Sequence, residues 1–130
     1  MVDTLFTKII KGEMPSYKIH EDELTFTFLD INQTNQGSLL IVPKAQVDHF
    51  FDLEDSDYQA IFQRAKVLSP ILKKAFGSKR VGLIVEWLEV PHVHIRLFPI
   101  NYPGDIGNSK VTLLSDEEMK HIQNKILELL

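Results

Sequence analysis

The chain has 130 residues, enough for one domain with a hydrophobic core and too few for two ordinary domains, so we expect a single domain over residues 1–130. With 44% apolar and 25% charged residues it has the composition of a globular protein, and its formal net charge of −4 argues against binding to duplex nucleic acid. The absence of cysteine excludes disulfides, thiolate metal sites, iron–sulfur clusters and a cysteine nucleophile.

The first predicted element is a short helix. Apolar residues at helical spacing indicate a helix over residues 5–10, with Thr4 as its N-cap. Gly12 and Pro15 follow this segment and end the helix, because both residues disfavour a further turn.

Three strands are predicted in the first half of the chain, at residues 16–23, 24–31 and 39–43. In the second of these segments apolar and polar residues alternate, which places Phe26 and Phe28 on the same face. The third segment is a continuous apolar run, which is typical of a strand that is covered on both faces.

A long helix is predicted over residues 56–76. Its apolar stripe consists of Tyr58, Ile61, Phe62, Ala65, Leu68, Leu72 and Phe76. Gly77 follows as a stop signal. Pro70 lies inside this helix, and we expect it to kink or break the helix near Ser69, because proline lacks the N–H that bonds to the preceding turn.

The second half of the chain contains two more predicted strands and a last helix. Residues 80–87 predict another buried strand, and residues 92–98 predict a strand with alternating polar and apolar positions. A loop over residues 101–108 precedes the capping box of Ser115 and Glu118, which opens a helix toward the C-terminus. Three helices and about five strands without strict alternation predict an α+β fold with a mainly antiparallel sheet.

Two histidines and an arginine share one face of the last predicted strand. Because side chains alternate along a strand, His92, His94 and Arg96 point to one side, with about 7 Å between neighbours. A metal site would need a further ligand, and Arg96 would repel the cation. A phosphate site fits all three side chains, because a guanidinium binds phosphate oxygens and a neutral imidazole can attack phosphorus. A solvated face with ordinary surface histidines is the remaining alternative.

Three sequence blocks, in the same order and at similar spacing, resemble the histidine triad (HIT) family of nucleotide-binding proteins in its short bacterial form. They are LFTKIIKGEMPSYKIHEDE, FLDINQTNQGSLLIVPK and EVPHVHIRLFPI. The resemblance is strongest over residues 5–100 and weaker over the loop and helix of residues 101–130. It implies a HIT-like fold with about five strands in a mainly antiparallel sheet, one long helix, a short N-terminal helix and a C-terminal helix.

The resemblance also implies roles for individual residues. His94 matches the nucleophile that attacks the α-phosphate of a nucleotide, and His92 matches the residue that organises it. The attack requires an unprotonated Nε2, with the Nδ1–H held by an acceptor such as the carbonyl of His92. Asp30 matches the carboxylate that binds the ribose hydroxyls. The residues that match the apolar base pocket, and that also fit an ordinary core, are Leu5, Phe6, Ile9, Phe28 and Ile31.

The chain departs from the family pattern at several positions. Arg96 stands in place of the third histidine, where it keeps a positive contact to the phosphate but cannot donate a proton at neutral pH. Trp87 stands where short members have a glycine, and its ring would crowd the phosphate side. Gln46 and Ser38 replace two further histidines. Lys44 is a candidate phosphate contact, with a solvated lysine as the alternative, and the remaining histidines are expected at the surface: His20, His49 and His121.

We therefore predict a HIT-type nucleotidyl hydrolase or transferase, with His94, His92 and Arg96 as catalytic residues and without a metal or other cofactor. Candidate substrates are nucleoside phosphoramidates, nucleotidyl adducts and dinucleoside polyphosphates. The alternative is a module that binds nucleotide with little or no turnover because of Arg96, and a metal-dependent hydrolase is the least favoured reading. The expected partners are a purine nucleotide and a second copy of the chain, paired through the long helix and the fourth strand.

The sequence also bears on location in the cell. No apolar run approaches the ~20 residues that a membrane-spanning helix needs. Asp3 stands where a signal peptide would carry basic residues. We therefore expect a cytoplasmic protein that has neither a membrane nor duplex nucleic acid as a partner.

Overall fold

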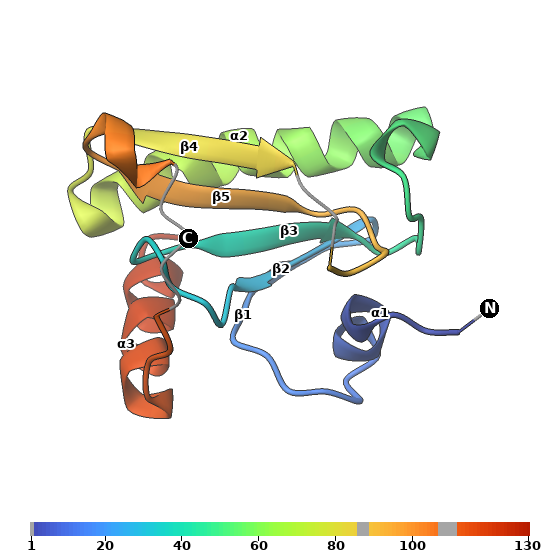
Figure 1. Cartoon of the computed structure of the whole chain (residues 1–130), viewed down its shortest axis with the longest axis horizontal. Helices are drawn as coiled ribbons and strands as arrows, with labels where there is room; N and C mark the ends of the chain where they lie inside the picture. The colour runs from blue at the N-terminus through green and yellow to red at the C-terminus, as the bar shows by residue number, and fades with distance from the viewer. Residues whose placement is uncertain (1, 86–88, 107–111) are drawn as a thin grey trace.

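The structure, a computed structural model, describes residues 2–85, 89–106 and 112–130. Within these ranges it contains a five-stranded antiparallel sheet with the strand order β1-β2-β3-β5-β4 (Figure 1). The strands are β1 (Lys18–Glu21), β2 (Thr25–Leu29), β3 (Leu39–Pro43), β4 (Arg80–Val85) and β5 (Ile95–Ile100). The α-helices are α1 (Leu5–Ile10), α2 (Asp55–Phe76) and α3 (Asp116–Leu127). The predicted α+β class and antiparallel sheet are confirmed.

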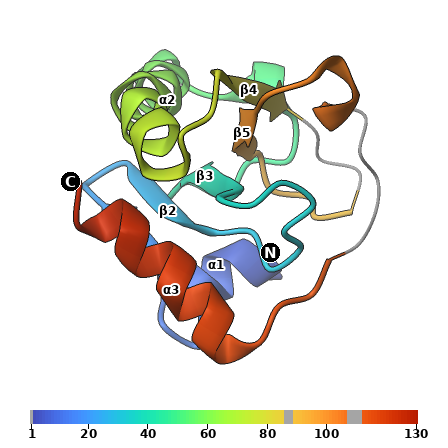
Figure 2. The ribbon, with the colours of Figure 1, turned by 90° about the vertical axis from the view of Figure 1, so that its left-hand side faces the viewer.

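The sheet buries side chains on both of its faces. On one face, residues of β3 and β5 share a core with α2 and α3, including Leu39, Ile41, Ile95, Leu97, Ile61, Leu68 and Ile122. On the other face α1 covers a smaller core, made of Phe6, Ile9, Phe26, Phe28, Leu40 and Val42. Figure 2 shows α1 and α2 on opposite sides of the sheet. This two-sided burial explains why every residue of β2 and β3 is buried.

Three predicted helix ends are confirmed, two through side-chain caps and one through a glycine. The Thr4 Oγ1 accepts a hydrogen bond from the Thr7 amide at the start of α1. Ser115 and Glu118 form the reciprocal capping box at the start of α3. Gly77 ends α2 in a left-handed conformation with a φ of 60°, which glycine adopts without a steric cost.

The expected break of the long helix at Pro70 is wrong. The helix α2 continues as one helix over 22 residues with Pro70 inside it. Pro70 and Lys66, whose carbonyl loses its amide donor, are both exposed, so this side of the helix faces solvent. The neighbouring Leu68 and Leu72 are fully buried, and their packing stabilises the helix on both sides of the proline.

The predicted burial of residues 80–87 is also wrong over the strand that the structure describes. β4 is an edge strand with exposed or half-buried positions throughout, and the Leu83 side chain is 40% exposed. Residues 86–88, the predicted continuation that contains Trp87, lie outside the described residues, as do positions 107 and 108 of the predicted loop. A short apolar run therefore predicted the strand correctly but not its place at the edge of the sheet.

Candidate active site

The two histidines of the predicted row precede β5 instead of lying within it. β5 begins at Ile95, where its pairing with β3 ends at Ile41, and the preceding Val93 amide donates to the Val47 carbonyl outside the sheet. His92 lies in a bend, and its side chain is completely buried. The prediction of two imidazoles and a guanidinium side by side on one exposed strand face is therefore wrong for His92, while His94 and Arg96 are both half-buried.

The ring of His94 is oriented by the backbone of His92. Its Nδ1 lies 2.8 Å from the His92 carbonyl oxygen. Since a carbonyl oxygen only accepts hydrogen bonds, Nδ1 carries the proton and Nε2 of the neutral ring keeps a free electron pair. The ring also packs edge-to-face on Phe6 of α1, with 5.0 Å between the ring centroids. The contact to His92 is the one that the sequence predicted for a nucleophilic histidine.

The buried ring of His92 is itself fixed at both nitrogens. Nε2 lies 2.9 Å from the Pro43 carbonyl oxygen and therefore carries the proton. Nδ1 then accepts a hydrogen bond from the Thr4 hydroxyl, at 2.9 Å. Burial lowers the pKa of His92, which favours the neutral ring that these two hydrogen bonds describe.

A hydrogen-bond network around Gln46 holds Thr4 in place. The Gln46 Oε1 accepts from the Thr4 amide at 3.0 Å and from the Thr7 hydroxyl at 2.6 Å. The Gln46 Nε2 donates to the Val2 carbonyl at 2.8 Å. The sequence marked Gln46 as a departure from the family pattern and Thr4 as a helix cap, but it did not predict that they meet at His92. Their separation by more than 40 residues along the chain gives no periodic signal.

Arg96 lies on β5, next to the edge strand β4, and on the sheet face that α1 partly covers. Its neighbours across the adjacent strands are Leu40 of β3 and Ile84 of β4. The guanidinium carbon lies 5.1 Å from the centre of the Phe98 ring, which places the cation over an aromatic face. Arg96 is a fixed positive charge two residues from His94 on the same chain segment.

Asp30 adds a carboxylate to this group of residues. Its Oδ1 accepts a hydrogen bond from the Asn32 amide at 2.9 Å, and among the described residues no donor contacts Oδ2. Burial raises the pKa of Asp30, and this effect is opposed by the Asn32 hydrogen bond and by the positive charges of Arg96 and His94. The structure thus brings Asp30, His94 and Arg96 within electrostatic reach of one another.

The five apolar residues assigned to the base pocket divide into two groups. Phe6, Ile9 and Phe28 are at most 8% exposed, and the rings of Phe6 and Phe28 meet edge-to-face at 5.6 Å. Leu5 and Ile31 are 45% and 67% exposed. The first three belong to the core beneath α1, while the other two present apolar surface to solvent.

Several other candidates lie in different surroundings. Lys44 forms an ion pair with Glu21 at 2.8 Å, which engages its charge away from the histidines. His49 and His121 are exposed, as expected, whereas His20 is half-buried and burial next to Arg64 lowers its pKa. Among the described residues no group of three His, Asp or Glu side chains is arranged to bind a metal ion.

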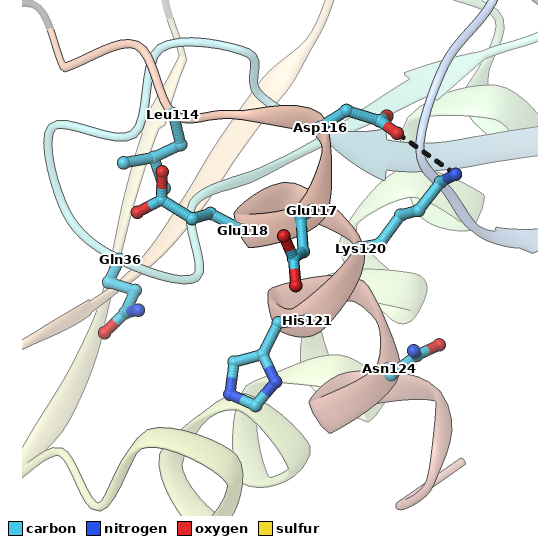
Figure 3. Close-up of a pocket in the computed structure, with 8 residues that line it drawn as sticks. All are labelled: Gln36, Leu114, Asp116, Glu117, Glu118, Lys120, His121 and Asn124. Atoms are coloured by element: carbon cyan, nitrogen blue, oxygen red, sulfur yellow. Dashed lines mark ion pairs between the residues drawn. The ribbon is translucent and has the colours of Figure 1, made fainter.

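A cavity of about 760 Å³ lies elsewhere, along α3 (Figure 3). Its lining includes Asp116, Glu117 and Glu118 of the first turn of α3, with Lys120 paired to Asp116 at 3.1 Å. Three carboxylates repel the phosphate groups of a nucleotide. The volume of this cavity therefore does not make it the better candidate for the site predicted from the sequence.

Comparison with known proteins agrees with the fold and with the resemblance. A family model of the HIT domain matches residues 11–101. An uncharacterized HIT-like protein from Methanocaldococcus jannaschii is 36% identical over 106 residues, which cover 78% of this chain and 81% of that protein. The adenosine 5′-monophosphoramidase of Saccharomyces cerevisiae is 34% identical over 96 residues, which cover 73% of this chain and 61% of the yeast protein. A crystal structure of a HIT-like protein from Bartonella henselae shares the fold, with a TM-score of 0.86 at 21% identity over 98% of this chain and 96% of that one.

Proposed function

This chain belongs to the HIT domain family, and we propose that it is a nucleotidyl hydrolase or transferase that acts at the α-phosphate of a purine nucleotide. The observation that carries the proposal is the hydrogen bond from His94 Nδ1 to the His92 carbonyl. That bond places a proton on Nδ1, so in the neutral ring it is Nε2 that carries the free electron pair a nucleophile requires. Relatives with named activities support the class of reaction, since they include adenosine 5′-monophosphoramidases and an adenylylsulfatase.

The proposed reaction has two displacement steps. Nε2 of His94 attacks the α-phosphorus, the bond to the leaving group breaks, and a nucleotidyl-histidine forms. Water, or another acceptor, then attacks the same phosphorus and releases the nucleotide from His94. The negative charge on the phosphate oxygens is met by the guanidinium of Arg96, which lies next to His94 along the chain.

We assign the remaining contacts to Asp30 and to the apolar residues under α1. The Oδ2 of Asp30 is available to accept hydrogen bonds from the ribose hydroxyls. The exposed side chains of Leu5 and Ile31 offer apolar surface for the base, above the buried Phe6, Ile9 and Phe28. A planar purine would bury this exposed apolar area when it binds.

We also propose a cytoplasmic homodimer that pairs through β4 and α2. β4 is an unpaired edge of the sheet, and its Leu83 is exposed, as are Tyr58 and Val67 of α2. An edge strand with exposed apolar residues is a surface on which a second strand can pair. No helix among the described residues is long and apolar enough to cross a membrane.

Hydrolysis of the p-nitrophenyl ester of AMP tests the proposal, because release of the coloured phenolate reports each turnover. We expect the wild-type protein to release it, and His94→Asn to bind AMP with unchanged affinity but to fall to the rate of the uncatalysed reaction. Mass spectrometry of protein quenched during turnover should detect an adenylyl group on the wild-type chain. Turnover by His94→Asn at the wild-type rate would refute the role of His94.

Arg96 favours a second candidate function, a module that binds nucleotide without turnover. A guanidinium cannot give up its proton in a protein, so Arg96 cannot protonate a leaving group. If the wild-type protein binds AMP in calorimetry but hydrolyses none of its esters, the binding module is the correct function.

A further inference from the structure

The residues around His94 differ in whether they can supply a proton. Both nitrogens of His92 are engaged, one by the Pro43 carbonyl and one by the Thr4 hydroxyl. Nδ1 of His94 is engaged by the His92 carbonyl, and its Nε2 is the proposed nucleophile. Neither imidazole therefore has a proton to give to a departing group.

The charged groups around them are no better suited to this task. The charges that act on Asp30 within the described part of the chain are those of Arg96, His94 and Glu89. Arg96 keeps its protons, and Glu89 is an exposed carboxylate, which accepts hydrogen bonds. Asp30 already accepts the Asn32 amide and is assigned to the ribose. The described residues thus place a fixed positive charge two residues from His94 along the chain, and the carboxyl group near it, Asp30, is assigned to the ribose.

We propose that this site, if it has the function proposed above, is selective for nucleotidyl substrates whose leaving group departs as an oxyanion, with Arg96 as the residue that sets this selectivity. Sulfate, phosphate, carboxylate and acidic phenolates belong to this class. Their charge is matched by the planar donor fork of the guanidinium. Amine leaving groups are excluded, because an amine departs from phosphorus only when it receives a proton.

The reaction balances without an added acid. In the first step the bond between Nε2 of His94 and phosphorus forms, and the bond from phosphorus to the leaving oxygen breaks, with its electron pair remaining on that oxygen. In the second step water forms a new bond to phosphorus and the bond to Nε2 breaks. The proton of the water passes to the solvent, so the products are AMP, the oxyanion and one proton.

A matched pair of esters tests this selectivity. The p-nitrophenyl and phenyl esters of AMP have similar shapes, but phenolate is the stronger base and leaves more slowly without an acid. Since a positioned general acid accelerates such steps by about 10²–10⁴-fold, we expect the wild-type protein to hydrolyse the phenyl ester at least ~100-fold more slowly. Adenosine phosphoramidate, with an amine leaving group, should react more slowly still. Comparable rates on all three substrates would overturn the proposal.

Two variants at Arg96 distinguish the effect of its positive charge from the effect of lacking a proton donor at this position. Arg96→His restores a proton donor, and we expect it to accelerate the phenyl ester and the phosphoramidate until they react within about tenfold of the p-nitrophenyl ester. Arg96→Gln, the control, removes the charge without adding an acid, so it should slow the p-nitrophenyl ester about tenfold or more and accelerate neither of the others. Acceleration by Arg96→Gln would contradict the assigned role, and thermal unfolding checks that both variants fold.

The outcome also distinguishes a failure of selectivity from a failure of the proposed function. Fast wild-type turnover of the phosphoramidate refutes the selectivity and leaves the hydrolase function intact. Wild-type protein that binds AMP but hydrolyses neither ester refutes both, and it identifies the chain as a binding module.

Discussion

The Thr4 hydroxyl makes two hydrogen bonds at once, and valine at this position removes both of them while nearly keeping the side-chain volume. The hydroxyl accepts from the Thr7 amide as the N-cap of α1, and it donates to Nδ1 of His92 at 2.9 Å. His92 is 0% exposed, so water cannot replace the lost donor, and the Thr7 hydroxyl, 3.5 Å from Nδ1, already donates to Gln46 Oε1. Thr4→Val therefore tests whether the network around Gln46 stabilises the site.

The expected loss of stability follows from these two bonds. Removing a helix N-cap costs ~1 kcal/mol. Leaving a buried acceptor without a partner costs about 1–3 kcal/mol. Together they predict that Thr4→Val lowers the free energy of unfolding by about 3 kcal/mol, which corresponds to a melting temperature lower by roughly 10 °C for a domain of this size.

Urea and thermal unfolding measure this loss, and Thr4→Ser is the matched control because it keeps the hydroxyl. We expect the serine variant to remain within about 1 kcal/mol of wild type. Nitrogen NMR of the histidine rings should show a changed Nδ1 resonance for His92 in the valine variant only. If valine and serine destabilise the protein equally, the hydroxyl does not hold His92 and the reasoning is wrong.

Three further predictions concern Asp30, His92 and the edge strand β4. Asp30→Asn should weaken AMP binding about 10- to 100-fold, since a hydrogen bond to a charged group contributes about 1.5–3 kcal/mol. Because burial raises the pKa of Asp30, the same substitution should also increase the free energy of unfolding at neutral pH, which chemical denaturation measures. Burial lowers the pKa of His92 in the folded protein, so the unfolded chain binds a proton at this residue more readily. The free energy of unfolding should therefore decrease as the pH falls below the pKa of the unfolded chain, near ~6.5. Urea midpoints measured against pH should show that His92→Asn flattens this dependence. Leu83→Asp places a charge on the exposed edge strand and should convert the proposed dimer to a monomer, with little loss of monomer stability. Light scattering measures the mass in solution, and an unchanged mass would exclude β4 from the interface.

Local sequence patterns predicted most of the fold, because a helix cap or stop depends only on residues within about one turn. The Thr4 cap, the Ser115 capping box and the Gly77 stop each require only a neighbouring turn, and each is present in the structure. The errors concern tertiary context. Pro70 is accommodated by packing on both sides of it, and the burial of β4 depends on its place at the edge of the sheet, which an apolar run does not reveal.

The candidate site likewise depends partly on local sequence patterns and partly on contacts between distant segments of the chain. Asp30, His94 and Arg96 were predicted to act together, and the structure brings them within electrostatic reach of each other. Period-two alternation failed at His92, because the strand begins at Ile95, where its pairing with Ile41 of β3 ends. The contacts of His92 with Thr4 and of Thr4 with Gln46 join segments far apart in sequence, and no short-range pattern encodes them.

The burial of His92 changes how the charge of the site is distributed. A row of two solvated histidines and an arginine would supply up to three positive charges to a phosphate. In the structure His92 is buried, which lowers its pKa, and its carbonyl accepts a hydrogen bond from Nδ1 of His94. The fixed positive charge two residues from His94, the proposed nucleophile, is that of Arg96, because a guanidinium stays protonated across the pH range in which histidines titrate. Under the proposed mechanism Arg96 would stabilise an oxyanion at any of these pH values. The leaving-group series is therefore a sharper test of the proposal than the pH profile.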